Sequence, residues 1–421
     1  MTPLIKQRIE QIRRCKVPEG YKKVKMWMCP VEWKVTTLNT VADVGQGYTF
    51  KREYQGQSVG RWNYFKVADI GLKNTGIYLS SAINKVDDSL IKQMGCKPFS
   101  AGSIVFPRVG AVLLNNNKRI LLQDSIVDDN VLVLTVKDVF TCNNIFLYYL
   151  LSRLRLEDWC NSGLVPVINS KTVLKQTVNL PPIEEQQKIA AILTTQDKVI
   201  ELKEKRLAEK QRQKKYLMQQ LLTGKKRLPG FYGAWSFPKA KELFQSVSDK
   251  DHNGDLAVLS STQDRGIVPR DEVDIDIKYD ACSLVNYKKV SKGNFVISLR
   301  SFQGGIEYST YTGLVSPAYT VLSSRKEISD GYYKQFFKST DYINRLNVAV
   351  YGIRDGKQIS YEDFGRLRIP YPPIKEQDAI AEVLSTADHE IDLLQQDIEQ
   401  EKQKKKALMQ LLLTGIVRVK T

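Results

Sequence analysis

The sequence predicts an α+β fold: two mixed α/β domains separated by two long antiparallel, coiled-coil-like helices in a pseudo-twofold, circular arrangement. An internal repeat predicts the helices, because PPIEEQQKIAAILTTQD at Pro181–Asp197 returns as PPIKEQDAIAEVLSTAD at Pro372–Asp388. LMQQLLTG at Leu217–Gly224 returns as LMQLLLTG at Leu408–Gly415. Both returns lie 191 positions on, so the copies align without a gap, and 21 of 44 residues are identical. Solenoid repeats span only about 20–50 residues, so this offset indicates duplicated domains.

The first domain is expected at residues 1–180, with an N-terminal lead-in segment. Apolar runs bounded by turn residues predict strands at 101–114 (AGSIVFPRVGAVLL) and at 129–136 (DNVLVLTV). NIFLYYLLSRL at 144–154 predicts a helix.

The first repeated helix is expected within residues 181–227. Pro-Pro favours its start and Thr-Gly its end, which leaves about 39 residues, or roughly 58 Å of helix. Heptad spacing of apolar residues, with a polar middle, favours helices that pair with each other or with a partner rather than two solvated surface helices. The expected packing positions, taken from both copies, are Ile189, Leu193, Ile200, Leu207, Leu217 and Leu221, and Ile380, Leu384, Ile391, Ile398, Leu408 and Leu412.

The second domain is expected at residues 228–371 and the second repeated helix at 372–421. Strands are predicted at 293–305 and 318–324 and one helix at 331–346. The offset of 191 also maps Gly102 onto Gly293 and Val105 onto Val296, whereas most of the rest has diverged. Matched scaffolds with unlike surfaces suggest two related tasks on different targets. Because the second helix ends where a third unit would begin, a closed arrangement of two domains and two helices is expected.

The charge is positive and unevenly distributed. The chain carries 63 Lys and Arg against 46 Asp and Glu, a net charge of +17. Residues 1–180 contribute +11, residues 184–227 contribute +6, residues 228–374 contribute +2 and residues 375–421 contribute −2. A basic chain most often has a polyanionic partner, here DNA or RNA. The opposite signs of the two helices favour their pairing.

The composition favours a cytoplasmic location. No apolar run is long enough to span a membrane, and the N-terminus lacks an apolar signal-peptide core. Six scattered cysteines without paired spacing are expected to be reduced, and with only two histidines a zinc site is improbable.

Candidate nucleic-acid contacts are the basic and amide side chains in glycine-rich turns. Arg, Asn and Gln can make bidentate hydrogen bonds to base edges, while Lys mainly neutralises phosphate. Each single residue is weak evidence, because loop arginines are usually solvated. The candidates are Lys51, Arg52, Arg61, Trp62, Arg108 and Asn115–Arg119 in the first domain, and Gln263, Arg265, Arg270, Arg300, Gln303, Arg354, Lys357 and Gln358 in the second.

No catalytic set is evident in the sequence. It contains neither the P-loop pattern GxxxxGK[ST] nor HExxH, and its two histidines lie outside any motif. The competing hypotheses are an enzyme, either a nuclease or a methyltransferase, and a stand-alone coiled-coil scaffold or DNA-binding protein without further partners. The missing motifs argue against an enzyme. The divergence of the two domains beside such similar helices argues against a plain scaffold.

Two variable domains, each followed by a helix that opens PPIEEQQKIAAIL or its copy and closes LMQQLLTG or its copy, resemble the specificity (S) subunit of type I restriction-modification systems. The resemblance covers the whole chain. STQDRGIVPR at 261–270, SPAYTVL at 316–322 and YGIRDGKQIS at 351–360 also look like segments of target-recognition domains in this family.

This resemblance implies a non-catalytic subunit. Each target-recognition domain would read one half of a bipartite, asymmetric double-stranded DNA target, and the helices would act as spacer and docking platform. Implied partners are methyltransferase (M) subunits, which carry S-adenosylmethionine, and restriction (R) subunits, which use ATP and Mg²⁺. This chain is itself expected to hold no cofactor or metal.

Overall fold

The computed structural model describes residues 3–24, 27–72, 76–161, 163, 165–263, 265–273, 281–299, 301–349 and 359–419. The chain divides into two compact units, and each contains part of both long helices. Unit 1 comprises Met1–Lys205 and Gln396–Thr421, and unit 2 comprises Arg206–Gln395. The order domain, helix, domain, helix therefore describes the sequence, whereas each compact unit combines one domain with segments of both helices.

Unit 1 is built mainly of short strands. Apart from the long helices, its elements are α1 (Pro3–Arg13), β1 (Tyr21–Val24), β2 (Trp27–Pro30), β3 (Lys34–Thr37), α2 (Leu38–Val41), β4 (Ala42–Gln46), η1 (Arg52–Tyr54), β5 (Trp62–Phe65), α3 (Val67–Ile70), β6 (Tyr78–Leu79), β7 (Asn84–Val86), α4 (Asp88–Met94), β8 (Ile104–Pro107), η2 (Ala111–Asn115), β9 (Arg119–Leu121), β10 (Ser125–Val127), β11 (Val131–Val136), α5 (Asn144–Ser152), η3 (Leu156–Trp159), α6 (Ser170–Leu174) and β12 (Thr177–Leu180).

The largest sheet of unit 1 has the strand order β4-β11-β8-β9-β6. It is antiparallel except between β6 and β9, which run parallel. A three-stranded sheet, β10-β5-β7, and the pairs β1-β2 and β12-β3 complete the unit. The inner strands β8 and β11 are almost wholly apolar and bury side chains on both faces. Ile104, Phe106, Leu132 and Leu134 pack with α5 in one core, and Val105, Val131 and Val133 pack in a second.

Unit 2 repeats this plan with fewer strands. Its elements are α8 (Ala240–Leu243), β13 (Phe244–Val247), β14 (Leu259–Thr262), β15 (Gly266–Pro269), η4 (Arg270–Glu272), η5 (Ala281–Asn286), β16 (Lys288–Val290), β17 (Phe295–Ile297), α9 (Ser301–Gly304), β18 (Glu307–Tyr308), β19 (Gly313–Val315), β20 (Thr320–Ser324), α10 (Asp330–Phe336), α11 (Thr340–Ala349) and α12 (Tyr361–Arg366). Its four-stranded sheet has the order β13-β20-β17-β18, and β14-β15 and β16-β19 form separate pairs.

The duplication extends to the topology of the sheets. The order β13-β20-β17-β18 in unit 2 matches β4-β11-β8-β9 in unit 1, strand for strand. Gly102 and Gly293 precede β8 and β17, and both adopt a positive φ, of 83° and 95°. Val105 and Val296 are fully buried in those strands. The alignment that the sequence predicted therefore places equivalent residues at equivalent positions of two similar sheets.

Three predicted elements differ in extent from the observed ones. The strand expected at 101–114 is only β8, because Gly110 adopts a positive φ of 92° and the chain then turns into η2. The strand expected at 293–305 is β17 followed by the short helix α9. The single helix expected at 331–346 is two helices, α10 and α11. Between them, the Ser339 hydroxyl donates a hydrogen bond to the carbonyl of Phe336 and accepts one from the backbone N–H of Tyr342.

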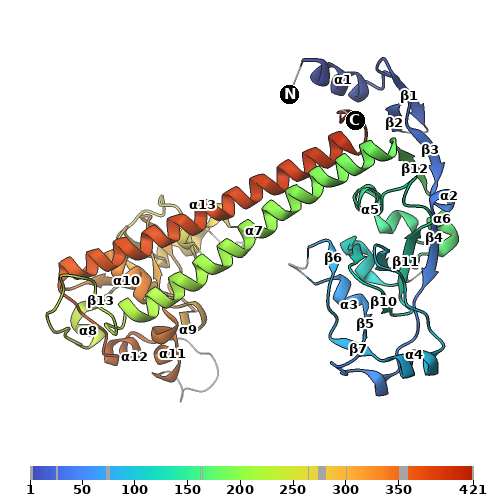
Figure 1. Ribbon diagram of the computed structural model, residues 1–421. Coiled ribbons are helices and arrows are strands. Elements are labelled where there is room, and N and C mark those ends of the chain that lie inside the picture. The colour runs from blue at the N-terminus through green and yellow to red at the C-terminus, as the bar shows by residue number, and fades with distance from the viewer. Residues whose placement is uncertain are drawn as a thin grey trace. The chain divides into compact units, whose positions relative to one another are not determined.

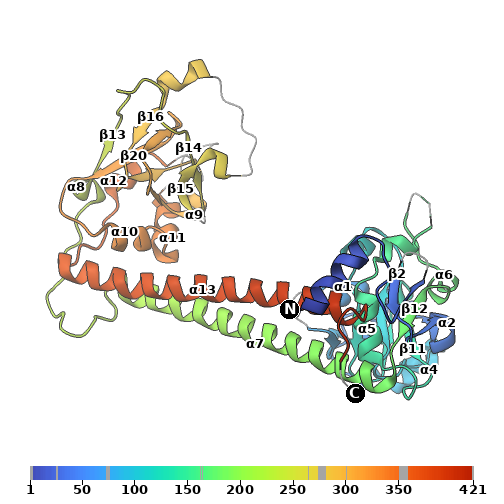
Figure 2. The same ribbon diagram turned by 90° about the horizontal axis from the view of Figure 1, so that it is seen from above.

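The two repeated helices are α7 (Ile183–Leu221) and α13 (Ile374–Leu412), each of 39 residues. Figures 1 and 2 show them side by side. Ion pairs between lysines and carboxylates join the two helices. In both units the order of these pairs along the chain shows that the helices are antiparallel. In unit 1 the pairs are Lys405–Asp197, Lys402–Glu204, Lys203–Asp397 and Lys203–Glu401. In unit 2 they are Lys210–Glu390 and Lys214–Asp388.

The heptad leucines near the helix ends belong to the domain cores. In unit 1, Ile189, Leu193, Leu408 and Leu412 pack in the core that contains α5. In unit 2, Leu217, Leu221, Ile380 and Leu384 pack in the core that contains α10. The mid-helix residues are also covered: Ile200, Ile391 and Ile398 are buried and Leu207 is half-buried. These leucines hold domain and helices together, so a charge placed on them would test folding rather than the docking of a partner.

In each unit, a buried glutamate in the first turn of a long helix binds an arginine and a tryptophan from other segments. In unit 2, the fully buried Glu376 accepts two hydrogen bonds from Arg227, at 2.5 and 2.6 Å, and one from the indole of Trp235 at 2.9 Å. In unit 1, the equivalent Glu185 accepts hydrogen bonds from Arg418, at 2.7 and 2.9 Å, and from Trp33 at 3.2 Å. The C-terminal segment thus completes the unit that contains the N-terminal domain.

We expect Arg418→Ala to destabilise unit 1 and Arg227→Ala to destabilise unit 2, each by about 3 kcal/mol, because each change leaves a buried carboxylate without its cation. Thermal unfolding followed by calorimetry measures the effect. Arg366→Ala is the control, since Arg366 and Glu362 are an exposed pair within α12, and it should change stability by less than about 1 kcal/mol. Equal stability of Arg418→Ala and the parent chain would contradict closure through the C-terminal segment.

Candidate nucleic-acid interface

Two of the predicted basic turns in unit 1 lie beside the small three-stranded sheet. Lys51 and Arg52 are exposed at the start of η1, where Lys51 lies 3.7 Å from Glu53. Arg61 is exposed, and its guanidinium stacks on the ring of Trp62, 4.6 Å from the centroid. The Trp62 indole donates to Asp88 at 2.7 Å, which holds the ring in place. A held ring with a guanidinium above it offers both stacking and phosphate contact to a nucleic acid.

The other basic candidates of unit 1 are less exposed, and the side chains of Lys118 and Arg119 bind the protein itself. Arg119 donates to the carbonyls of Lys118 and Leu72, at 2.9 and 3.1 Å. Lys118 is only 2% exposed and donates to Asn116 and to the carbonyl of Leu154. Burial lowers the pKa of Lys118 to about 7. Arg108 is half-buried just after β8. Asn116, Lys118 and Arg119 therefore serve the local structure, and Lys51, Arg52 and Arg61 are the exposed cations of this predicted set.

In unit 2 a tight hairpin presents Gln263 and Arg265, which are both exposed. Thr262 accepts a hydrogen bond from the backbone of Arg265 at 3.1 Å and donates to the carbonyl of Gly266 at 2.9 Å. Gly266 has a φ of 77°, and a Cβ atom there would lie 2.8 Å from the carbonyl oxygen of Tyr308. The Arg265 side chain is itself held by the carbonyl of Glu272 at 2.9 Å. The tip of the β14-β15 hairpin is therefore pinned at several points.

The remaining candidates of unit 2 have different environments. Arg270 is half-buried and donates to Ser260 at 3.2 Å. Gln303 is exposed on the short helix α9. The remaining predicted contacts, Arg300, Arg354, Lys357 and Gln358, lie outside the described residues.

Sequence reasoning missed two lysines beside the hairpin. Lys334 and Lys338 line a concavity of about 570 Å³ together with Gln263, Arg265 and Lys214 of α7. Their spacing of four residues within a predicted helix was the available signal, because such residues share one face. In the structure Lys334 lies on α10, whereas Lys338 lies in the turn between α10 and α11.

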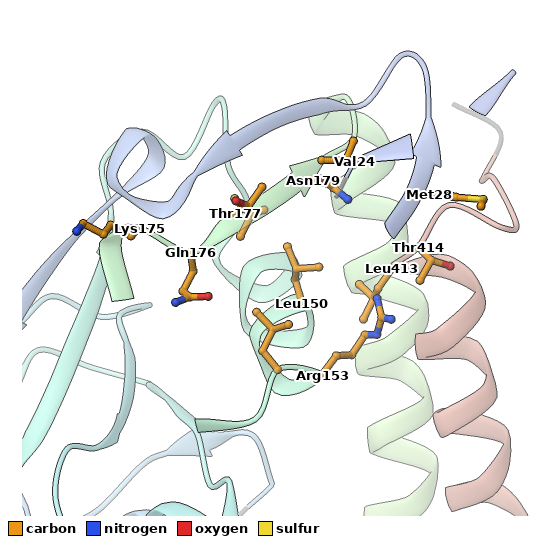
Figure 3. A pocket seen from close by; sticks show the side chains of 12 residues that line it. Val24, Met28, Leu150, Arg153, Lys175, Gln176, Thr177, Asn179, Leu413 and Thr414 are labelled. Carbon is orange, nitrogen blue, oxygen red and sulfur yellow. The ribbon is translucent and has the colours of Figure 1, made fainter. Parts of the chain in front are cut away.

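An equivalent concavity of about 520 Å³ lies in unit 1 between α5 and α13. Lys405 and Met409 line it, and these are the repeat partners of Lys214 and Met218, which line the concavity of unit 2. Arg153 contributes to it and also to a neighbouring cavity of about 300 Å³. Figure 3 shows the Arg153 side chain extending toward Leu413, which follows the last residue of α13.

The middle of the helix pair carries polar groups instead of leucines. In unit 1, Glu401 accepts hydrogen bonds from Gln196 at 2.6 Å and from Lys203 at 2.9 Å. These hydrogen bonds, from Gln196 first and then Lys203, lower the pKa of Glu401 to about 2. Polar residues at heptad core positions specify register more than they add stability. The register of α7 against α13 in unit 1 is therefore set by this network.

We expect Glu401→Gln to change how stability depends on pH. The folded pKa of Glu401 lies below the ordinary glutamate value of about 4.3, so its contribution is complete above that value and is lost as pH falls toward 2. The variant should be less stable at pH 7, and its deficit should shrink between about pH 5 and pH 2. Denaturant unfolding at several pH values measures this. Glu399→Gln is the control because Glu399 contacts Gln403 of its own helix. A deficit that stays constant with pH would contradict the prediction.

Within the described residues, no three His, Cys, Asp or Glu side chains are placed to hold a metal ion. Within the same residues, no helix is long and apolar enough to cross a membrane.

Comparison with known protein families identifies both domains. The family model "Type I restriction modification DNA specificity domain" matches residues 30–212 and again residues 234–403, and the two matches together cover most of the chain. The chain belongs to this family. Each match includes one domain and the larger part of the long helix that follows it, in agreement with the duplication seen in the sheets.

Members of this family match the chain over nearly its whole length. The putative type I restriction enzyme MjaX specificity subunit of Methanocaldococcus jannaschii is 26% identical over 439 residues, covering 96% of this chain and 98% of that protein. The type I restriction-modification S subunit from M. genitalium has a TM-score of 0.56 at 14% identity, covering 90% of this chain and 96% of its own. A type I restriction-modification structure that concerns complex assembly and conformational transition has a TM-score of 0.55 at 16% identity, covering 92% and 99%. These structures show the same fold for this member of the family.

Proposed function

We propose that this chain is the subunit that gives a type I restriction-modification complex its DNA sequence specificity, with each unit reading one half of a bipartite, asymmetric target. The observation that carries the proposal is the pair of family domains on matching sheets with unlike surfaces. A duplicated scaffold whose loops differ can present two different sets of base contacts. In unit 1 the turn around Arg61 and Trp62 is the candidate reading surface, and in unit 2 it is the tip of the β14-β15 hairpin.

The helix pair supports a role as spacer and docking platform. A helix of 39 residues spans about 58 Å, and paired helices keep their ends apart far better than a flexible linker. The heptad leucines are buried in the domain cores and between the two helices. The methyltransferase subunits would therefore dock on the solvent-exposed face of the helices. Leu202 of unit 1 and Leu393 of unit 2 are repeat partners and are 53% and 51% exposed, which suits two copies of one partner.

The chemistry is assigned to the partners. The described residues supply cations, amides and aromatic rings rather than a nucleophile with an adjacent base, which suits recognition more than catalysis. We propose that methyltransferase subunits bring S-adenosylmethionine, that restriction subunits bring ATP and Mg²⁺, and that the complex acts on DNA in the cytoplasm.

Mapping of methylated adenines tests this function. A host that lacks other such systems would express this chain with its methyltransferase subunits, and the genome would be sequenced for methylation. The expected result is one bipartite motif, with the chain alone leaving the genome unmethylated. Methyl transfer by the pure chain, or methylation without any motif, would refute the proposal.

A further inference from the structure

Lys338 connects the recognition hairpin of unit 2 to its core. It follows α10, and its ammonium donates a hydrogen bond to the carbonyl oxygen of Gln263 at 3.1 Å. The same ammonium forms an ion pair with Glu307 of β18, whose carboxylate is only 2% exposed. The lysine of this ion pair thus binds the backbone of the hairpin at Gln263.

The segment that carries Lys338 is itself tied to the long helices. Gln335, near the end of α10, donates to Asp388 of α13 at 2.6 Å, and Lys214 of α7 forms an ion pair with the same carboxylate. Within unit 2, the segment from α10 to Lys338 therefore connects the hairpin to the helix pair through hydrogen bonds. Lys338 is the last link of this chain of contacts, since its ammonium bonds directly to the recognition loop.

We infer that Lys338 is a positioning residue for sequence discrimination: by fixing the Gln263 carbonyl, it sets which base edges the side chains of Gln263 and Arg265 can reach. The inference rests on the proposed function. The competing role is purely structural, with Lys338 serving only to neutralise the buried Glu307. Hydrogen bonds to bases tolerate small displacements poorly, so a loosened tip loses discrimination while phosphate contacts elsewhere persist.

A set of matched variants separates the two roles. Lys338→Met combined with Glu307→Gln removes the tether without leaving a buried charge, and Met retains the apolar stem. Glu307→Gln alone keeps the bond from Lys338 to Gln263. Lys338→Arg keeps a cationic donor and should restore function. Lys326→Met removes the same charge from an exposed position of unit 2 outside the candidate interface, where Lys326 approaches the ring of Tyr371.

The assay uses the complex of this chain with its methyltransferase subunits, on its mapped target and on duplexes substituted in one half or the other. The double variant should lose about tenfold of its discrimination at one half only, with an unchanged Tm. Glu307→Gln, Lys326→Met and Lys338→Arg should retain discrimination. Wild-type discrimination by the double variant, or equal losses at both halves, would overturn the positioning role. A wild-type complex without any sequence preference would overturn the proposed function itself, and this inference with it.

Discussion

Exchange of residues 232–371 for the same region of a relative is expected to change one half of the recognised DNA sequence and leave the other half intact. The two units have separate cores and separate recognition loops, so specificity should be modular. Affinity for the original target should fall by a factor of about 10³ or more, toward non-specific binding. Methylation mapping of the chimera in vivo measures both halves at once.

The structure adds one requirement to this exchange. Trp235 lies inside the exchanged region, and its indole donates to the buried Glu376 outside it. The incoming domain must therefore supply a tryptophan at this place. The reciprocal chimera, in which residues 30–180 are exchanged, is the control and should change the opposite half. Simultaneous changes in both halves of the target would show that the units do not read independently.

A seven-residue insertion in both long helices, after Lys205 and after Gln395, is expected to lengthen the preferred spacer between the two half-sites. These points are the boundaries of the compact units, so the contacts within each unit survive. Seven residues add about 10.5 Å of helix, which corresponds to about three base pairs at 3.4 Å each. Three base pairs also rotate the duplex by about 100°, and a heptad does not rotate the helix pair by that amount. The longer spacer should therefore be preferred but bound more weakly than the natural one is by the parent.

Binding to a series of duplexes with graded spacers measures the shift. The control carries the insertion in α7 alone, which must break one set of ion pairs because Lys203 pairs with Asp397 on one side of the insertion and Lys210 with Glu390 on the other. That control should lose stability rather than gain a new spacer. An unchanged spacer preference in the paired insertion would show that something other than the helices sets the distance.

The predictions that succeeded came from patterns repeated along the chain. The length of both helices, their antiparallel pairing and the match between Val105 and Val296 follow from an offset that is visible without any structure. The single helix expected at 331–346 was wrong, because helical periodicity continues across the turn at Ser339 that separates α10 from α11. For the candidate site, residue type indicated turns but could not distinguish the exposed Arg61 from Arg119, which is half-buried and donates to two carbonyls.

The sequence alone determined the duplication, the two long helices with their heptads, and the resemblance to a family, because these depend on residue order and local periodicity. Tertiary structure decided which leucines of the helices belong to domain cores and where the compact units divide. It also decided that Glu185 pairs with Arg418 and Glu376 with Arg227. Likewise, only the structure shows that Lys338 donates a hydrogen bond to the carbonyl of Gln263. Those contacts join residues far apart in the chain, and burial depends on everything that packs around a side chain, which no local pattern specifies.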